Sequence, residues 1–236
     1  MLNLFNPRSH KPTVPQINVK QYIDCYETIK VLVRYTQPKF LCDIGASDGS
    51  WGHTLSLLDP KLRHIVSFEP RREAFAALQK RKIKGVRRKN YPFGLGNKKS
   101  RKYVRGGTTS ASFFQEKDQQ LFFPKSLSDD KEAAQIFRLD DIYRTYKLPF
   151  PDCIKIDVQG YEQYVLEGGT SILTHAKFLV IELSFREFYK NQPTLSSTLK
   201  LLESHEFELI DFGFQWRSKE GELIQIDGIF RNRNVI

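Results

Sequence analysis

Two short stretches of this chain have the residue types and spacing of a nucleotide-like binding site. An apolar run at 40–44 leads into Gly45 and Gly49, and a second apolar run at 64–68 leads into Glu69. In open parallel sheets a ligand sits beyond the carboxyl ends of the strands. There a glycine turn lets the backbone come close, and an acid after the next strand accepts hydrogen bonds from ribose hydroxyls. The two stretches therefore predict a ligand with an adenosine-like ribose.

The spacing of the glycines indicates which ligand this is. A pyrophosphate is bound by the compact G-x-G-x-x-G turn at a helix N-terminus, whereas this chain has Gly45-x-x-x-Gly49-x-x-Gly52 with Asp43 and Asp48 beside it. Two carboxylates would repel a pyrophosphate and attract a cationic ligand. S-adenosylmethionine has a ribose, a sulfonium and an amino group but no phosphate, so the pattern favours it over a nicotinamide dinucleotide. An ordinary strand–turn–helix remains the alternative for the turn taken alone.

Strands and helices alternate along the rest of the chain. Together they predict an α/β fold with a Rossmann-like, seven-stranded sheet, mostly parallel with an antiparallel last strand, and helices on both faces. Pro70 is expected in the first turn of a helix, and Asp140 or Asp141 as the cap of another. The expected helices are 21–36, 51–58, one beginning near Pro70, 142–146, 161–166 and 195–204. The expected strands are 40–44, 64–68, 86–89, 153–158, 178–183, 207–212 and 223–230. A hairpin arm is expected at 102–105.

The composition suits one globular domain. The chain has 236 residues, 40% of them hydrophobic and 27% charged, which allows a sizeable core. Residues 1–20 are polar and are expected to form an arm before a single domain at 21–236. We expect a cytoplasmic protein, because no apolar run approaches the ~20 residues that span a bilayer and the start lacks a signal peptide's apolar core. Cys25, Cys42 and Cys153 form no C-x-x-C pair, so reduced thiols and no metal site are predicted.

The formal net charge of +10 is concentrated in one segment. Residues 80–105 include twelve Lys and Arg and no Asp or Glu. A run of this kind can be a solvated face that keeps a protein soluble. It can also be a positive surface that attracts an acidic substrate, such as a phosphate-bearing glycan intermediate, or RNA. Because the run follows Glu69 closely, it should flank one side of the cofactor cleft.

A second motif, at 154–162, supplies acids that could take part in a reaction. If the apolar strand before Asp157 neighbours the first strand, Asp157 emerges beside Gly45, where the strand order reverses. A carboxylate there could hold a substrate hydroxyl, take its proton or orient the charged end of the cofactor; the alternative is an acid that caps the next helix. Glu162 lies in the first turn of that helix, where the dipole stabilises it, and Glu182 ends another apolar strand. Asp157, Glu162 and Glu182 are the candidate catalytic residues.

Five motifs together resemble the FkbM-type S-adenosylmethionine-dependent methyltransferases: D-I-G-A-S-D-G, S-F-E-P, F-G-L-G, R-L-D-D and I-K-I-D-V-Q-G-Y-E. The resemblance runs from about residue 40 to 182, and the last motif is its most specific part. It implies O-methylation of a hydroxyl on a sugar, glycan intermediate or natural product. It also implies that Asp157 and Glu162 match the family's acidic pair, and that Ser110 and Ser112 contact substrate. The expected cofactor contacts are Asp43, Gly45, Ala46, Ser47, Gly49, Glu69, Pro70 and Phe93.

At two positions this sequence differs from the pattern of the family it resembles. Ser47 stands where the family usually has Asn, and Gln159 stands where it usually has Glu, which removes one charge beside Asp157. The irregular segment 106–130 is expected to be a lid or substrate loop. Phe93, Phe113, Phe114 and Trp51 are candidate walls against adenine or a sugar ring, although each taken singly suits a core.

Two other functions remain open for comparison. An RNA methyltransferase is suggested by the basic run, but the chain shows no RNA-binding appendage and no Pro-Pro-aromatic turn after the strand that precedes Asp157. A non-catalytic cofactor-binding module is the third possibility, which the intact Gly45 turn with Glu69 disfavours. We therefore expect a small-molecule or glycan substrate, acidic if the basic run binds it, and no nucleic-acid partner.

Overall fold

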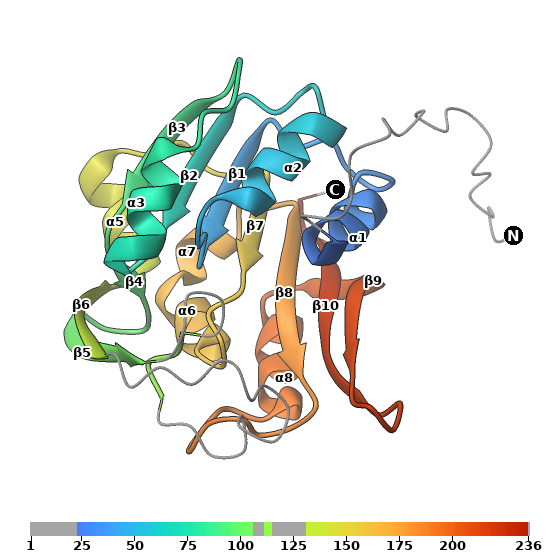
Figure 1. The fold of residues 1–236 in the computed structure, drawn as a ribbon. Coiled ribbons are helices and arrows are strands. Elements are labelled where there is room, and N and C mark those ends of the chain that lie inside the picture. The colour runs from blue at the N-terminus through green and yellow to red at the C-terminus, as the bar shows by residue number, and fades with distance from the viewer. Residues whose placement is uncertain (1–22, 106–110, 115–130, 236) are drawn as a thin grey trace, which may run out of the picture.

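A computed structural model describes residues 23–105, 111–114 and 131–235 of the chain. Its centre is a seven-stranded sheet between two layers of helices (Figure 1). All pairings in this sheet are parallel except those that β10 makes with β8 and β9. The predicted fold is confirmed. The strands in spatial order are β3 (Arg87–Tyr91), β2 (His64–Phe68), β1 (Phe40–Ile44), β7 (Cys153–Ile156), β8 (Phe178–Ser184), β10 (Leu223–Asn232) and β9 (Phe207–Arg217).

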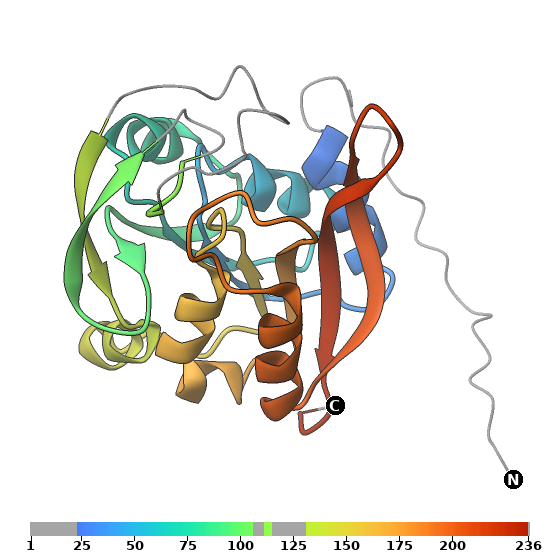
Figure 2. The same ribbon diagram turned by 90° about the horizontal axis from the view of Figure 1, so that it is seen from below.

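Helices cover both faces of the sheet (Figures 1 and 2). One layer holds α1 (Ile23–Leu32), α2 (Ser50–Leu58) and α3 (Arg72–Lys80), and the other holds α5 (Leu139–Tyr146), α6 (Glu162–Gly168), α7 (Thr170–Leu173) and α8 (Leu195–Ser204). Because successive side chains of a strand alternate between faces, Leu41 packs with the core under α1 and α2, while Cys42 and Ile44 pack with the core on the opposite face. Asp43 therefore lies on the same side as Leu41.

The order of the strands reverses between β1 and β7. β2 lies on one side of β1 and β7 on the other, and Ile44 pairs with both Phe68 and Ile156. The segments that follow these three strands consequently leave the sheet at the same edge, where ligands of open α/β sheets bind.

A second, three-stranded sheet stands beside this edge. It consists of β4 (Gly94–Leu95), β6 (Lys131–Phe137) and β5 (Ser100–Arg105), in that order, with β5 antiparallel to β6. The predicted arm at 102–105 is the end of β5. The sequence did not predict β6, whose Glu132 and Gln135 interrupt its apolar residues. The predicted arm 1–20 lies outside the described residues, and so does the predicted loop 106–130 apart from 111–114.

Several local predictions were wrong. Pro70 precedes the helix instead of lying in its first turn, since α3 begins at Arg72 after the N-cap residue Arg71. Asp140 lies inside the first turn of α5 and makes no cap there. Its carboxylate instead accepts hydrogen bonds from the backbone N–H groups of Ser171 (3.2 Å) and Ile172 (3.1 Å), at the start of α7. Asp140 thus joins two helices.

Strand boundaries also differ from the prediction. β7 ends at Ile156, two residues before the predicted end, because Asp157 and Val158 already belong to the turn that follows. β9 continues to Arg217, five residues beyond the predicted end, and pairs with β10 across three register shifts. Asp157 therefore lies just beyond the carboxyl end of β7 rather than within a strand.

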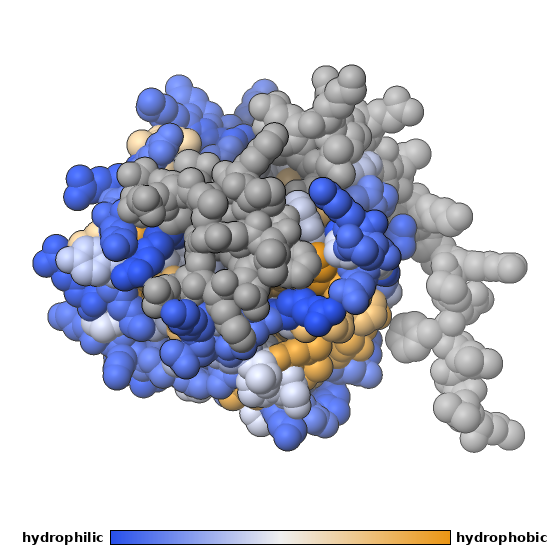
Figure 3. Space-filling view, turned by 60° about the horizontal axis from the view of Figure 1, so that its bottom comes forward, coloured by the Kyte–Doolittle hydropathy of each residue, from blue (hydrophilic) through white to orange (hydrophobic). Residues whose placement is uncertain are grey.

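The surface agrees with the high content of charged residues. The coloured part of the face shown in Figure 3 is mostly hydrophilic, with the largest patch of apolar side chains at the lower right. No helix within the described residues has the length and apolar character of a membrane span. The three cysteines form no disulfide, and Cys42 and Cys153 are buried in the neighbouring strands β1 and β7.

Candidate active site

The turn after β1 depends on a glycine at position 45. Gly45 has φ of 72°, and a Cβ atom there would lie 1.8 Å from the carbonyl oxygen of Asp157. The backbone N–H groups of Gly45 and Ala46 both donate to the carbonyl oxygen of Phe68, at 3.0 and 3.1 Å. Only glycine combines this conformation with so close an approach. The turn thereby ties the ends of β1, β2 and β7 together.

Glu69 lies on the β2 side of this turn and is 7% exposed to solvent. One carboxylate oxygen accepts the N–H of Ser47 and the other accepts the N–H of Arg71, each at 2.9 Å. Burial raises the pKa of Glu69, while these two N–H groups oppose that rise. A carboxylate has about four lone-pair positions, so Glu69 can still accept hydrogen bonds from a ligand.

Lys155 is a site residue that the sequence prediction missed. Its side chain is 6% exposed, and its Nζ atom donates to the carbonyl oxygen of Gly45 at 2.7 Å. The same nitrogen lies 3.6 Å from Asp43 Oδ1 and 3.5 Å from Asp157 Oδ2. Burial lowers the pKa of Lys155, but the carboxylates of Asp157 and Asp43 outweigh it and raise the pKa above its ordinary value. Lys155 is therefore an ammonium that supports the turn from beneath.

The two acids expected to attract a cationic ligand are occupied inside the protein. Asp43 is fully buried beside Lys155 and does not line the cavity described below. Asp48 accepts the N–H of Ser50 at 2.9 Å and forms an ion pair with Arg81. The argument from a pair of acids was thus wrong in its residues, although Glu69 and Asp157 supply two carboxylates at the cavity itself.

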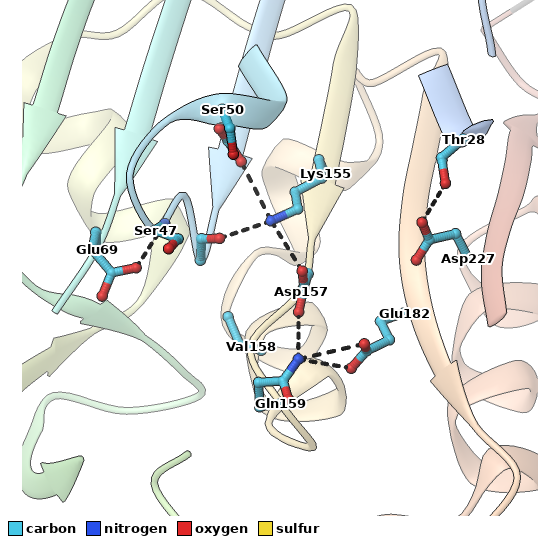
Figure 4. Close-up of polar contacts among 12 residues, drawn as sticks. Thr28, Ser47, Ser50, Glu69, Lys155, Asp157, Val158, Gln159, Glu182 and Asp227 are labelled. Atoms are coloured by element: carbon cyan, nitrogen blue, oxygen red, sulfur yellow. Dashed lines mark hydrogen bonds and ion pairs between the residues drawn. The ribbon is translucent and has the colours of Figure 1, made fainter. Parts of the chain in front are cut away.

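Asp157, Gln159 and Glu182 form a connected group at the ends of β7 and β8 (Figure 4). The amide nitrogen of Gln159 lies 2.9 Å from Asp157 Oδ1 and 3.2 and 3.4 Å from the two carboxyl oxygens of Glu182. Burial raises the pKa of Glu182 well above its ordinary value, and the charge of Asp157 raises it further. Asp157 does not cap α6, which has no side-chain cap.

Glu162 holds the turn that carries this group. Its Oε1 atom accepts the N–H groups of Val158 at 3.0 Å and Gly160 at 3.1 Å. Burial raises the pKa of Glu162 to about 7. Because the carboxyl group of Glu162 accepts backbone N–H groups of the turn, it fixes the turn that carries Asp157 and Gln159.

A cavity with about 600 Å³ of empty space, part of it open to solvent, lies over these residues. Of the predicted cofactor and catalytic residues it brings together Gly45, Ser47, Glu69, Pro70 and Asp157. Ala46, Gly49 and Phe93 are not in its wall. Phe93 packs in the core against Phe68 and Phe137, and Trp51 is also a core residue. The remaining wall is formed by Ile44, Phe68, Arg71, Gly94, Leu95, Val104, Ala111, Phe113, Val158 and Gln159.

Glu162 and Glu182 line a different cavity, of about 270 Å³, between α6, β8 and α8. Gln159 stands between the two cavities, since it lines the larger one and its amide reaches Glu182 in the smaller one. The three predicted catalytic acids are therefore neighbours, but Asp157 alone among them faces the larger cavity.

The segment 111–114 closes one side of the larger cavity. Ser112 is buried, and its hydroxyl donates to the carbonyl oxygen of Gln159 at 2.7 Å. Phe113 and Phe114 pack against Tyr161, with ring centroids 5.1 and 5.3 Å away. Ser112 thus contacts the Asp157–Gly160 turn rather than the cavity, and Phe113 supplies an aromatic wall. Ser110, the other predicted substrate contact, lies outside the described residues.

The chemistry of the wall fits S-adenosylmethionine better than a dinucleotide. The carboxylates of Glu69 and Asp157 face the cavity, and apolar groups of Leu95, Val104 and Phe113 surround them. Carboxylates favour ribose hydroxyls and positive charge, and apolar walls suit a nucleobase. At the start of α2 the carboxylate of Asp48 accepts the N–H of Ser50, and its charge would repel a pyrophosphate there.

The fold and this site define the class: the chain has the architecture of a Rossmann-like methyltransferase. The family model described as the methyltransferase FkbM domain matches residues 43–209. The chain belongs to this FkbM methyltransferase family, as the motifs suggested.

Similar proteins agree with this assignment. The 2-O-methyltransferase NoeI of Sinorhizobium fredii (strain NBRC 101917 / NGR234) is 29% identical over 179 residues, which are 72% of each chain. The solved structure of methyltransferase FkbM from Methylobacillus flagellatus KT shares 17% identity at a TM-score of 0.54. That match covers 84% of this chain but 45% of the other, so this chain spans less than half of that structure's length.

A second solved structure has a similar length. Magnesium protoporphyrin IX methyltransferase (ChlM) from Synechocystis PCC 6803, solved with bound SAM, matches at a TM-score of 0.50 with 14% identity. The match covers 92% of this chain and 86% of the other. At these identities the two structures support the fold alone.

Proposed function

We propose that this protein transfers a methyl group from S-adenosylmethionine to a hydroxyl of a sugar, a glycan intermediate or a natural product. The observation that carries the proposal is that Glu69 and Asp157 face one 600 Å³ cavity from opposite sides of the Gly45 turn. The family supports methyl transfer, and the printed activity of NoeI, 2-O-methylation, supports a hydroxyl acceptor.

The bound cofactor would supply a methyl group on a cationic sulfur. Glu69 would accept hydrogen bonds from the ribose, held in place by the N–H groups of Ser47 and Arg71. Leu95 and Phe113 would form apolar walls that exclude water from the cavity. Glycine at position 45 lets the backbone approach without a side chain. Much of the rate of such a displacement can come from alignment of the reacting atoms alone.

Asp157 would act on the acceptor. Its carboxylate faces the cavity and is fixed on one oxygen by Gln159 and on the other by Lys155. From this position it can accept a hydrogen bond from the acceptor hydroxyl and take its proton as the methyl group is transferred. General-base assistance of this kind typically contributes about 10²–10⁴-fold. Glu162 and Glu182 have no access to the larger cavity in this arrangement, so they support Asp157.

The basic run supplies part of the surface near the cavity, which supports an acidic acceptor. Arg81 and Arg88 serve the fold, because Arg81 binds Asp48 and Arg88 donates to the carbonyl oxygen of Leu78 at 2.9 Å. Lys102 lies 5.2 Å from the centre of the Tyr161 ring. It shares a face of β5 with Val104, which lines the cavity. An acidic group on the acceptor would find a cation there.

The test has a binding step and a transfer step. Calorimetry of the purified protein with S-adenosylhomocysteine, NAD and a structured RNA should show saturable binding of the first alone. Transfer of labelled methyl groups should then be measured on neutral and acidic oligosaccharides. Asp157→Asn should lower turnover by at least tenfold in a folded protein, while the exposed control Asp141→Asn should not. Binding of NAD but not S-adenosylhomocysteine would refute the proposal.

A further inference from the structure

One amide group joins two carboxyl groups at the edge of the cavity. The Gln159 side chain contacts Asp157 and Glu182 with the same nitrogen atom (Figure 4). An amide nitrogen carries two hydrogens, so it can donate to both carboxyls at once. A carboxylate side chain at this position would have no hydrogen to donate and would add a third negative charge.

The backbone of Gln159 is held in an uncommon conformation. Its φ is 54°, in the left-handed region that non-glycine residues seldom occupy. The hydroxyl of Ser112 donates to its carbonyl oxygen, and Glu162 binds the N–H groups of the residues on either side of it. Strained conformations persist where the surroundings fix them. The side chain is consequently presented to Asp157 and Glu182 by a clamped turn.

Acidic groups outnumber the ammonium groups that face this cluster. The charges around Asp157 come from Lys155 on its own strand, Asp43 on β1, Glu162 on α6, Glu182 on β8 and Asp227 on β10. Asp227 pairs in register with Glu182, so the two side chains share a face of the sheet. Lys155 lies nearest to Asp157, at 3.5 Å. Gln159 gives Asp157 a second donor, on the oxygen that Lys155 does not contact.

We infer that Gln159 is a positioning residue that holds the carboxyl group of Asp157 toward the cofactor and acceptor. The inference rests on the proposed function, because it gives Asp157 a task at the cationic sulfur and the acceptor hydroxyl. Lys155 and Gln159 bind the two oxygens of Asp157, so its carboxyl group cannot rotate away. Burial and the neighbouring charge of Asp157 raise the pKa of Glu182 well above its ordinary value.

The test compares two ligands that differ in one charge, and it needs no acceptor. S-adenosylmethionine carries a cationic sulfur and S-adenosylhomocysteine a neutral one, so the ratio of their affinities reports the charge of Asp157. Gln159→Met removes the amide at similar volume, and we expect it to lower the preference for the cation at least threefold. Asp157→Asn should lower it at least as far, and the double variant no further. The matched control is Gln163→Met on α6, which should leave the ratio unchanged.

The pH dependence gives a second readout that a purely structural role would not move. Gln159→Glu brings a third carboxyl against Asp157 and Glu182, and like charges this close together favour protonation within the group. Its preference for S-adenosylmethionine should therefore increase from pH 6 to pH 9, whereas that of the wild type stays level. A ratio in Gln159→Met within twofold of the wild type, or a level profile in Gln159→Glu, would overturn the inference. Failure of the wild type to bind either ligand would instead refute the proposed function.

Discussion

Replacement of Lys155 by Met should destabilise the protein strongly, because it would leave Asp43 as a buried charge without its cation. Lys155 and Asp43 lie 3.6 Å apart with side chains 6% and 1% exposed. At an effective dielectric constant of 20, two charges at this distance attract by about 4–5 kcal/mol. Removal of one partner of a buried ion pair typically costs about 3–5 kcal/mol. We expect a loss of this size in the free energy of unfolding, measured by urea denaturation at pH 7.

A second lysine provides the control. Lys177 lies 3.5 Å from Asp152, nearly the same distance, but its side chain is 49% exposed and that of its partner 29%. Exposed pairs contribute about 0–1 kcal/mol, so Lys177→Met should cost no more than that. Asp43→Asn combined with Lys155→Met should recover part of the loss, because no uncompensated charge remains.

The loss in Lys155→Met should grow with pH. Burial raises the pKa of Asp43, and the charge of Lys155 is the strongest influence that lowers it. In Lys155→Met the pKa of Asp43 is therefore raised further above its value in the unfolded protein. A carboxyl with a raised folded pKa contributes stability below its unfolded pKa and loses it as pH rises through the folded pKa. Denaturation from pH 5 to pH 8 should therefore show a widening gap from the wild type, absent in the double variant. A loss equal to that of Lys177→Met at every pH would refute a buried, charged Lys155.

Three further outcomes follow from the site. Glu69→Ala should weaken S-adenosylhomocysteine binding by about 1.5–3 kcal/mol, roughly 10–150-fold, and equal affinities in calorimetry would remove Glu69 from the cofactor site. Gly45→Ala should lower the free energy of unfolding by about 1–3 kcal/mol more than Gly85→Ala, because both have positive φ but no atom lies within 4 Å of a Cβ at Gly85. Neutralising the part of the basic run at 98–102 should raise KM for an acidic acceptor and flatten its salt dependence with kcat nearly unchanged. The positions to change are Lys98, Lys99, Arg101 and Lys102, and the control changes Arg87 and Lys89 on β3. An unchanged KM would indicate that the run is only a solvated face.

The sequence predicted the sheet because its signals are local. Each parallel strand except the polar edge strand β3 is a short apolar run, and glycine or an acid marks the point where β1 and β2 end. These two features placed Gly45 and Glu69 at the same edge, and the structure brings both to one cavity. The boundaries of β7 and β9 depended on turn geometry and on pairing with distant strands, which a local pattern does not specify.

The role of Lys155 depended on register, which the sequence does not give. Asp43 pairs with Lys155 across β1 and β7, and this places the acid against the ammonium instead of the ligand. One signal was available, since side chains alternate along a strand and residues 155 and 157 therefore share a face. A lysine inside an apolar strand, two residues before an acid, is a pattern that predicts a buried ion pair.

Gln159 shows how a departure from a family pattern can be compatible with the same chemistry. A carboxylate at this position would stand within hydrogen-bond distance of two others, which only a shared proton could make stable. The glutamine amide supplies two hydrogens in their place and leaves Asp157 bound on both oxygens. Asp157 is then the acid at the end of β7 that faces the cavity, and Lys155 balances the charges of Asp157 and the buried Asp43. Under the proposed function, the buried cation and the clamped amide would let a single carboxylate serve the acceptor in this chain.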